Sequence, residues 1–283
     1  MTTLPASRES LNVTSRYRRT LIGNRDAAVR TTVEQWLAVD FGDTRDVFDR
    51  SFRAWLAGAT ATLTAAQRRA AVLTGIYVGD YLASETDGQI ADPPEVDADA
   101  YAGRTADGRP VRQVLALAAV SASVALSQRR GRQAALQAGL NRAVRVMRTE
   151  SMEAARGSLS DAMQADDRIV GWRRQTSARP CGACLGLAAR GLRATDEALR
   201  IHPACSCTAV PVVDGVVERV TLVTGTALWE RMTPAEQDAA IGPEKAQLVR
   251  QGDAQLGDLI TEHHHPDWPD GVYETPLARL AGS

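Results

Sequence analysis

All four cysteines of this 283-residue chain fall between Cys181 and Cys207, where they form two short-gap motifs. The first is Cys181-Gly-Ala-Cys184, and the second is His202-Pro-Ala-Cys205-Ser-Cys207. The chain has no run of about 20 apolar residues, and its first residues lack the basic start and apolar stretch of a secretory signal. In the reducing cytoplasm that this indicates, clustered cysteines are more often metal ligands than disulfides. We therefore expect a metal site and no membrane partner.

Zinc suits these donors because it prefers a tetrahedron of thiolates and imidazoles. Cys-x-x-Cys places two sulfurs on one ion, since Gly182 lets the backbone fold back beneath it. His202 repeats the two-residue gap with Cys205 and could close the site. Alternate residues of an extended segment point to the same side, so Cys205 and Cys207 could both bind with His202 displaced, or Cys205 could be the spare. The sequence predicts four ligands out of five: Cys181, Cys184, His202, Cys205 and Cys207.

A structural role for this zinc is favoured over a catalytic or redox role. A catalytic zinc needs three protein ligands and an open water position, and no Glu or Asp is placed beside the motifs as a base. Redox chemistry is disfavoured because the Cys-x-x-Cys pair does not open a βα unit and two more thiols follow it. A structural ion would hold together a module too small to carry its own core.

The composition favours a mainly helical fold. Hydrophobic residues make up 44% of the chain and charged residues 24%, as in an ordinary folded protein. Aromatic residues reach only 5% while alanine is abundant, which favours helices packed through small side chains over an aromatic-rich β-sandwich. We expect a mainly α fold with long helices, a small β-containing, zinc-stapled module and an extended C-terminal tail, an α+β class.

The N-terminal region, residues 1–84, is expected to be helical because its apolar residues recur at helical spacing. Thr64-Ala-Ala-Gln67 fits a capping box, in which the Thr hydroxyl accepts from a free amide and Gln67 reaches back. This pattern predicts that a third helix starts there and ends near Leu82.

A change of pattern follows in residues 85–110, where Asp, Gly and Pro accumulate and predict a linker or long loop. Residues 111–167 return to helical spacing and form the Arg-rich, long-helix region. The pattern is broken near Arg129-Arg-Gly-Arg132, so two helices are expected, the second exceeding about 25 residues.

The cysteine motifs lie inside a predicted zinc module, residues 168–215. Two β-prone runs flank them, Ile169-Val-Gly-Trp172 and Thr208-Ala-Val-Pro-Val-Val213. A small β-containing module is therefore expected.

Residues 216–283 predict short helices followed by an extended tail. Thr233-Pro-Ala-Glu236 is a second capping box, with Pro at the first helical position. Gly242 is expected to separate this helix from the next, which Gly252 closes. The tail contains His263–His265, and a three-His run in a polar tail is more often solvated than a second metal site.

Positive charge is concentrated in the middle of the chain although the net charge is −1. Between Arg104 and Arg156 the chain has ten Arg against three acidic residues, an excess of seven positive charges. Arg142, Arg145 and Arg148 are three residues apart and rise along one face of the expected helix. Such a row is usually only a solvated face, and the alternative is contact with DNA phosphates or with an acidic partner.

Five motifs follow one another in the C-terminal half: Trp172-Arg-Arg, Cys181-Gly-Ala-Cys184, His202-Pro-Ala-Cys205-Ser-Cys207, Met232-Thr-Pro-Ala-Glu-Gln237 and Gly242-Pro-Glu-Lys-Ala-Gln-Leu-Val-Arg-Gln-Gly252. Their order resembles that of the minor head, or head morphogenesis, proteins of tailed bacteriophages similar to the F protein of phage Mu. The resemblance covers about residues 150–252. The N-terminal helices match that family only in general character.

This resemblance implies a structural protein of a phage head and no enzyme activity. It implies association with the portal protein and with major capsid or scaffold proteins, inside the capsid and near packaged double-stranded DNA. Such a protein would be made in the host bacterial cytoplasm, become part of the virion, and act in head assembly or DNA delivery. The zinc is inferred from the chemistry of the donors, not from the family.

Two other functions are compatible with the residues. A cellular zinc-containing nucleic-acid-binding protein would carry basic side chains on the zinc module, where arginines do occur, among them Arg173, Arg174, Arg179, Arg190, Arg193 and Arg200. A cytoplasmic thiol redox enzyme or metalloenzyme would use the cysteines themselves. The chain has no phosphate-binding Gly loop, no Gly-x-Ser-x-Gly and no His-Glu-x-x-His, so it offers few candidate catalytic residues.

Overall fold

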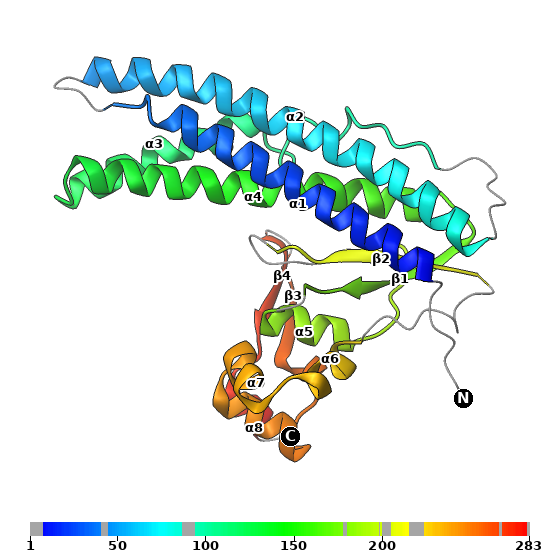
Figure 1. The fold of residues 1–283 in the computed structure, drawn as a ribbon. Helices are drawn as coiled ribbons and strands as arrows, with labels where there is room; N and C mark the ends of the chain where they lie inside the picture. The colour runs from blue at the N-terminus through cyan, green and yellow to red at the C-terminus, as the bar shows by residue number, and fades with distance from the viewer. Residues whose placement is uncertain are drawn as a thin grey trace. The chain divides into compact units, whose positions relative to one another are not determined.

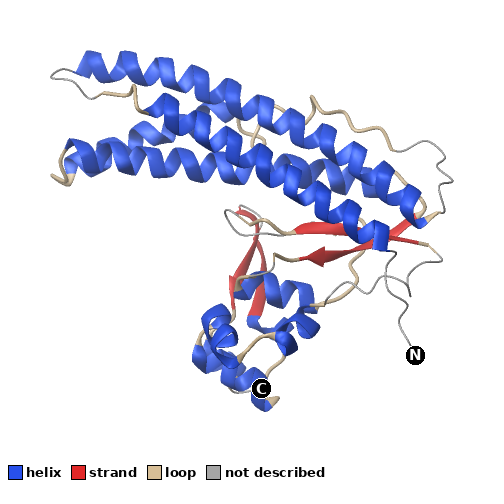
Figure 2. Cartoon of the chain, in the orientation of Figure 1, coloured by secondary structure: helices blue, strands red, loops and turns tan. Residues whose placement is uncertain are grey.

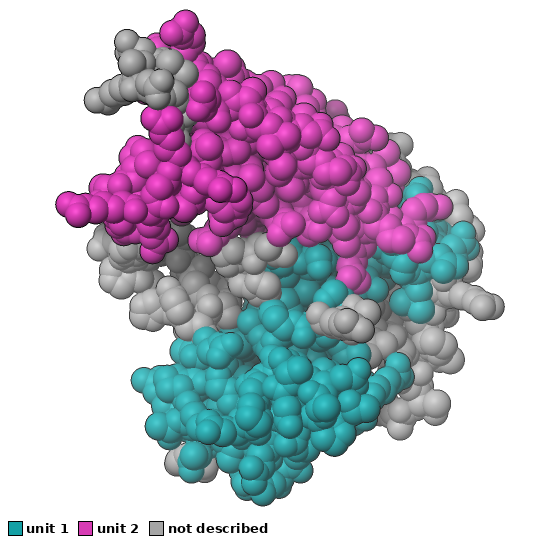
Figure 3. Space-filling view, turned by 60° about the vertical axis from the view of Figure 1, so that its left-hand side comes forward, with its two compact units in different colours: residues 1–15, 78–94, 160–283 teal, residues 16–77, 95–159 magenta. Residues whose placement is uncertain are grey.

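The computed structural model of the protein (Figures 1 and 2) describes residues 8–40, 45–86, 94–177, 180–197, 199, 205–214, 224–265 and 268–281. The chain divides into two compact units, each assembled from segments that are distant in the sequence (Figure 3). The helical unit comprises Arg16–Tyr77 and Glu95–Leu159. The mixed unit comprises Met1–Ser15, Val78–Pro94 and Ser160–Ser283.

Long helices dominate the structure, as the composition predicted. They are α1 (Arg8–Trp36), α2 (Arg45–Glu85), α3 (Val111–Ser127) and α4 (Arg132–Gln164). The expected break between the last two is confirmed, because Arg129 and Gly131 both adopt positive φ angles, 57° and 79°, that end one helix before the next begins. With 33 residues, α4 is as long as its apolar pattern indicated.

Aromatic rings from α1 and α2 form the centre of the core of the helical unit. The Trp36 ring meets Trp55 edge-on with centroids 4.7 Å apart, and Phe52 also lies edge-on against Trp36. Helix α4 approaches this cluster at Gly139, where a Cβ atom would lie 2.7 Å from the Trp36 ring and 2.9 Å from the carbonyl oxygen of Ala118 in α3. The close approach of α4 to α1 and α3 therefore depends on a residue without a side chain.

The expectation of a third helix starting at Thr64 is wrong. Helix α2 continues through this position as one helix of 41 residues. Leu63 is fully buried in the core, so the apolar stripe runs on without changing direction. Gln67 does not cap its own helix: its amide donates to the carbonyl oxygen of Arg104 at 2.7 Å and accepts from the amide of Gly103 at 2.9 Å. A distant loop thus takes the hydrogen bonds that a cap would have used.

That loop is the described part of the expected linker. Residues 87–93 lie outside the described residues, and residues 94–110 form turns that close with an antiparallel bridge between Arg104 and Pro110. Gln67 anchors this segment to α2. The described part is therefore fixed to the helices and is not a free linker.

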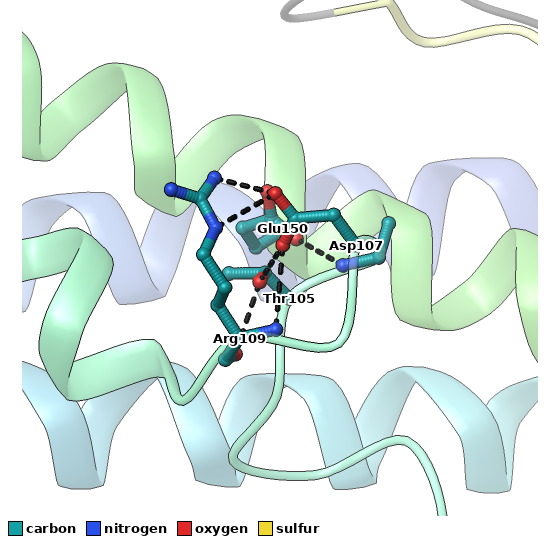
Figure 4. Close-up of polar contacts among 5 residues, drawn as sticks. Thr105, Asp107, Arg109 and Glu150 are labelled. Carbon is teal, nitrogen blue, oxygen red and sulfur yellow. Dashed lines mark hydrogen bonds and ion pairs between the residues drawn. The ribbon is translucent and has the colours of Figure 1, made fainter. Parts of the chain in front are cut away.

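A second anchor joins the same loop to α4 through Glu150 (Figure 4). The Ala106 amide donates to Glu150 Oε2 at 3.0 Å. Beside it, Arg109 Nε donates to Asp107 Oδ2 at 2.8 Å, and this interaction lowers the pKa of Asp107 to about 2. Burial raises the pKa of Glu150 to about 7, because the Ala106 hydrogen bond only partly offsets the loss of hydration.

The mixed unit contains the β structure that the sequence predicted. Strands β1 (Ile169–Gln175) and β2 (Thr208–Val213) pair antiparallel, from Ile169 opposite Val213 to Gln175 opposite Thr208. Helix α5 (Gly182–Ala189) lies between them in the sequence. The fold class is confirmed as mainly α with a small β-containing module.

Short elements complete the unit: α6 (Gly225–Arg231), α7 (Pro234–Ile241), α8 (Pro243–Gln251), the 3-10 turn η1 (Leu256–Leu259), β3 (Ile260–His265), β4 (Trp268–Glu274) and α9 (Leu277–Leu280). The capping box at Thr233 is confirmed, with the Thr side chain accepting from the Glu236 amide and Glu236 accepting in return. Gly242 separates α7 from α8, and Gly252 closes α8 in the left-handed conformation at φ 82°.

The C-terminal tail is extended, as expected, but it is not isolated. Strands β3 and β4 pair with each other as an antiparallel hairpin. Leu259, Ile260 and Leu280 are buried in an apolar cluster that also contains Leu185 of α5 and Trp229 of α6. His263–His265 lie in β3. The tail residues therefore contribute to the core of the mixed unit, a role that their weak periodicity did not indicate.

Among the described helices, none combines the length and the low charge that crossing a bilayer requires.

Replacing Gly139 by Ala should destabilise the helical unit. Overpacking against Trp36 and Ala118 costs about 1–3 kcal/mol, which outweighs a gain of at most about 1 kcal/mol in helix propensity. The matched control is Gly23→Ala in α1, because Gly23 is exposed and has nothing within 4 Å of its missing Cβ, so this change should raise stability. Chemical denaturation of both variants measures the two effects. Equal stabilisation by the two substitutions would contradict the close approach of α4.

Candidate metal centre

Helix α5 and the segment before β2 bring the cysteine motifs together. Cys181 immediately precedes α5, and Cys184 lies in its first turn. Cys205 and Cys207 lie just before β2, which is held in place by its pairing with β1. Two segments about twenty residues apart in the sequence thus meet at one place in the mixed unit.

The local sequence explains why α5 begins where it does. The Cys181 sulfur accepts from the Cys184 amide at 3.5 Å and so occupies the position of an N-cap. The rest of the helix, Gly-Ala-Cys-Leu-Gly-Leu-Ala-Ala, has no charged residue, and Leu185 is fully buried. Because this apolar helix is enclosed by the core, the Cys184 side chain has a fixed position.

Three sulfur atoms converge within bonding range of one ion. The Sγ atoms of Cys184, Cys205 and Cys207 all lie within 4.8 Å of one another, and all three residues are buried. The Cys184 and Cys205 sulfurs are 3.4 Å apart. Thiolates about 2.3 Å from zinc at the corners of a tetrahedron stand about 3.8 Å apart, whereas a disulfide bond is about 2.05 Å long. The spacing therefore fits metal coordination, and the four cysteines are free thiols.

The other two expected ligands are placed differently. Cys181 is exposed and lies outside the group of three, although its thiol contacts Cys184 at the start of the same helix. His202 lies outside the described residues. Cys205, which the sequence left as a possible spare, belongs to the buried group. The geometry therefore supplies three ligands from Cys184, Cys205 and Cys207, with Cys181 and His202 as candidates for the fourth.

The electrostatics of the buried thiols favour a metal over redox chemistry. The pKa of Cys184 is raised because its thiol interacts with those of Cys181, Cys205 and Cys207 and is buried. Contact with Cys184 lowers the pKa of Cys207, but contact with Cys205 and burial raise it by more. A protonated thiol is a poor nucleophile, which opposes a catalytic cysteine. A divalent cation reverses the balance, because a coordinating thiol loses its proton.

Arg174 in β1 is a feature of this site that the sequence did not single out. Its side chain is buried, at 4% exposure, and its charge lowers the pKa of Cys207. A zinc ion with three or four thiolates carries net negative charge, which a nearby guanidinium stabilises. The signal in the sequence was the alternation of β1, which turns Arg174 inward together with Trp172.

The arginines of α4 are not equivalent. Arg145 and Arg148 are exposed, whereas Arg142 is half-buried. All three lie on one helix of the helical unit, as the spacing predicted. Arg145 and Arg148 are therefore the two that a partner can reach.

Comparison with known proteins gives one result for this chain. A protein-family model described as VG15 protein matches residues 8–219. The match begins in α1 and ends after β2, so it includes the long helices and both cysteine motifs. No curated protein and no solved structure matches the chain.

Replacing Cys184 by Ser should abolish zinc binding and destabilise the mixed unit by several kcal/mol, since metal-binding free energy is folding free energy in such sites. The long helices should keep their circular dichroism signal. Elemental mass spectrometry measures the loss of zinc, and thermal unfolding measures the loss of stability. Retention of one zinc per chain with unchanged unfolding in the Cys184 variant would contradict the site.

The fourth ligand is decided by two matched substitutions, Cys181→Ser and His202→Ala, in the same assay. The change that removes a true ligand should weaken zinc binding by at least about tenfold, while the other should leave it unchanged.

Proposed function

The chain belongs to the VG15 family of phage proteins, and from this premise we propose that it is a structural minor capsid protein, or head morphogenesis protein, of a tailed bacteriophage. The family match, which spans roughly three quarters of the chain, supports a phage protein, and the capsid role is our proposal beyond it. The motif order from Trp172 to Gly252 supports the finer assignment through its resemblance to the Mu F-like proteins. Virion association follows from the proposal.

The metal centre is consistent with a structural role. Its thiols are buried, and coordination of one ion would tie α5 to the sheet of β1 and β2. With Cys181 or His202 as the fourth ligand, the site would be closed by protein donors and would leave no position for a substrate. We infer that zinc is a structural cofactor here and that the protein is not an enzyme.

Charge is divided between the two units in a way that the net charge of −1 conceals. The helical unit has 20 Arg against 12 Asp and Glu, a net charge of +8. The mixed unit has 13 Arg and Lys against 22 Asp and Glu, a net charge of −9. A polyanion would be attracted to the first unit and repelled by the second.

This division supports contact between the helical unit and packaged double-stranded DNA, with Arg145 and Arg148 as the accessible contacts and Arg142 beside them. A cellular protein that reads nucleic acid through its zinc module would rely on the arginines of residues 168–215, which belong to a unit that is acidic as a whole. The raised pKa values of the buried thiols oppose a thiol redox enzyme. The redox alternative has no observation that favours it, and the nucleic-acid alternative has only the arginines of residues 168–215.

The expected position is inside the capsid near the portal, with the portal protein and the major capsid or scaffold proteins as partners. The support for this position is the resemblance of the C-terminal motifs. Two of those motifs form α7 and α8, whose ends are set by the capping box at Thr233 and by Gly252. The protein would be made in the host cytoplasm and incorporated during head assembly.

Purified, nuclease-treated particles of the phage that encodes this chain should contain the protein at far fewer copies than the major capsid protein. Heads separated from their tails should retain it. Quantitative mass spectrometry of intact particles and isolated heads measures both, with a phage replication protein as the negative control. If the protein occurs only in the lysate and never in particles, the structural assignment fails.

Charge reversal at Arg145 and Arg148 should weaken duplex DNA binding by the full chain. Each lost phosphate contact lowers the slope of log affinity against log salt by about 0.9, so the double variant should show a slope smaller by about 2. Arg231→Glu with Arg279→Glu is the matched control, because both residues are exposed on the mixed unit and the charge change is equal. Equal loss in both variants would indicate a general charge effect and contradict a DNA-contacting face on α4.

A further inference from the structure

The helical unit contains a cavity of about 330 Å³ that the proposed function does not use. It lies between α4, α2 and the loop that precedes α3, and its volume is at the lower end of small-ligand pockets, which span about 300–1,000 Å³. The lining residues with side chains relevant to binding are Gln67, Tyr101, Arg104, Thr105, Glu150 and Glu153.

The walls of this cavity are held in place by tertiary contacts. Gln67 is buried and bonds to both Gly103 and Arg104, which fixes one side of the loop to α2. Tyr101 packs on α4 at Gly157, where a Cβ atom would lie 3.2 Å from the ring. The cavity is therefore preformed, and Tyr101 contributes an aromatic surface to it.

Glu150 brings a carboxylate to this cavity with only part of its bonding capacity used (Figure 4). Its Oε2 atom accepts from the Ala106 amide. Among the residues that the structure describes, no other donor bonds to this carboxylate and no cation forms an ion pair with it. A carboxylate can accept about four hydrogen bonds, so a donor group in the cavity would find acceptor positions available.

The guanidinium groups around the cavity are already bonded elsewhere. Arg109 is paired with Asp107 through its Nε and Nη2 atoms. Arg104 Nη1 donates to the carbonyl oxygen of Gly108 at 3.0 Å. In the next turn of α4, Arg156 Nη1 donates to Glu153 Oε1 at 3.4 Å. None of these three forms an ion pair with Glu150, although the charge of Arg109 lowers the pKa of this carboxyl.

We propose that this cavity binds a guanidinium group, carried either by a free alkylguanidine or by an arginine side chain of a partner protein. A planar guanidinium donates two parallel hydrogen bonds to a carboxylate, which an ammonium group does not. It also stacks on an aromatic ring, the surface that Tyr101 provides. The chemistry of the lining thus selects a planar cation over a spherical one.

Binding should depend on pH in a defined direction. The pKa of Glu150 is raised to about 7: burial raises it most, Glu153 and Asp107 add to the rise, and the Ala106 amide and Arg109 lower it. Of the other ionisable groups, Tyr101 and Arg104 line the cavity and Arg156 lies farther along α4. Only the ionised carboxylate pairs with a guanidinium, so affinity should rise roughly tenfold from pH 6 to pH 8, with a proton released on binding.

The test is calorimetric titration of the full chain at pH 8 with three compounds that share a butyl chain: butylguanidinium, butylurea and butylammonium. Butylguanidinium should bind at least about tenfold more tightly than the uncharged butylurea, and more tightly than butylammonium. Glu150→Gln should remove this preference while keeping the fold, because it removes a buried charge. Glu34→Gln, at an exposed position of α1, should leave binding unchanged.

A short arginine-containing peptide, compared with its citrulline counterpart, distinguishes the two sources of the group. Tighter binding of the arginine peptide than of butylguanidinium indicates a partner's side chain, and the reverse indicates a free molecule. Absence of butylguanidinium binding, or equal binding to the Glu150 variant, overturns the proposal. These results do not depend on whether the protein is found in virions, so failure of the capsid assignment is separately detectable.

Discussion

The mixed unit depends on the meeting of three buried sulfur atoms. A two-stranded sheet such as β1 with β2 is only marginally stable by itself, so it needs a further connection to the rest of the unit. Cys184 comes from α5, whereas Cys205 and Cys207 come from the strand side, and a shared ion would join the two. Since the ligand site forms only when α5 and the strands have folded against each other, binding of an ion there would stabilise the unit.

The division of charge gives the two units different physical roles. The ion would hold together the acidic unit, which a nucleic acid avoids, while the basic unit is built from helices that need no metal. In the proposed function, zinc would act on the acidic unit and would not contact the DNA-binding face itself. This separation fits a protein that meets both a protein assembly and packaged DNA, because each partner can be met by a surface of suitable charge.

Local signals were sufficient to predict those features of the fold that depend on neighbouring residues. The capping box at Thr233 was correct because its hydrogen bonds close within one turn. The similar pattern at Thr64 failed because Gln67 bonds to Gly103 and Arg104, more than thirty residues away. The cysteine spacing likewise identified the donors, but the choice among them depends on how α5 packs against the strands, which spacing does not encode. Arg174 was likewise not recognised as part of the metal centre, because its place beside the cysteines also depends on this packing.

The cavity at Glu150 and the wrong prediction of a helix start at Thr64 have the same cause, which is the way the loop before α3 is bonded to the helices. Side chains of α2 and α4 satisfy the polar backbone of the loop before α3, so Gln67 is buried and Glu150 is half-buried at the edge of the loop. Gln67 forms hydrogen bonds to two backbone groups of the loop, whereas Glu150 accepts one hydrogen bond from it and carries a charge. The loop therefore contacts the carboxylate only through the Ala106 amide among the hydrogen bonds of the described residues. A half-buried acceptor beside a preformed space therefore arises directly from the way this loop is anchored.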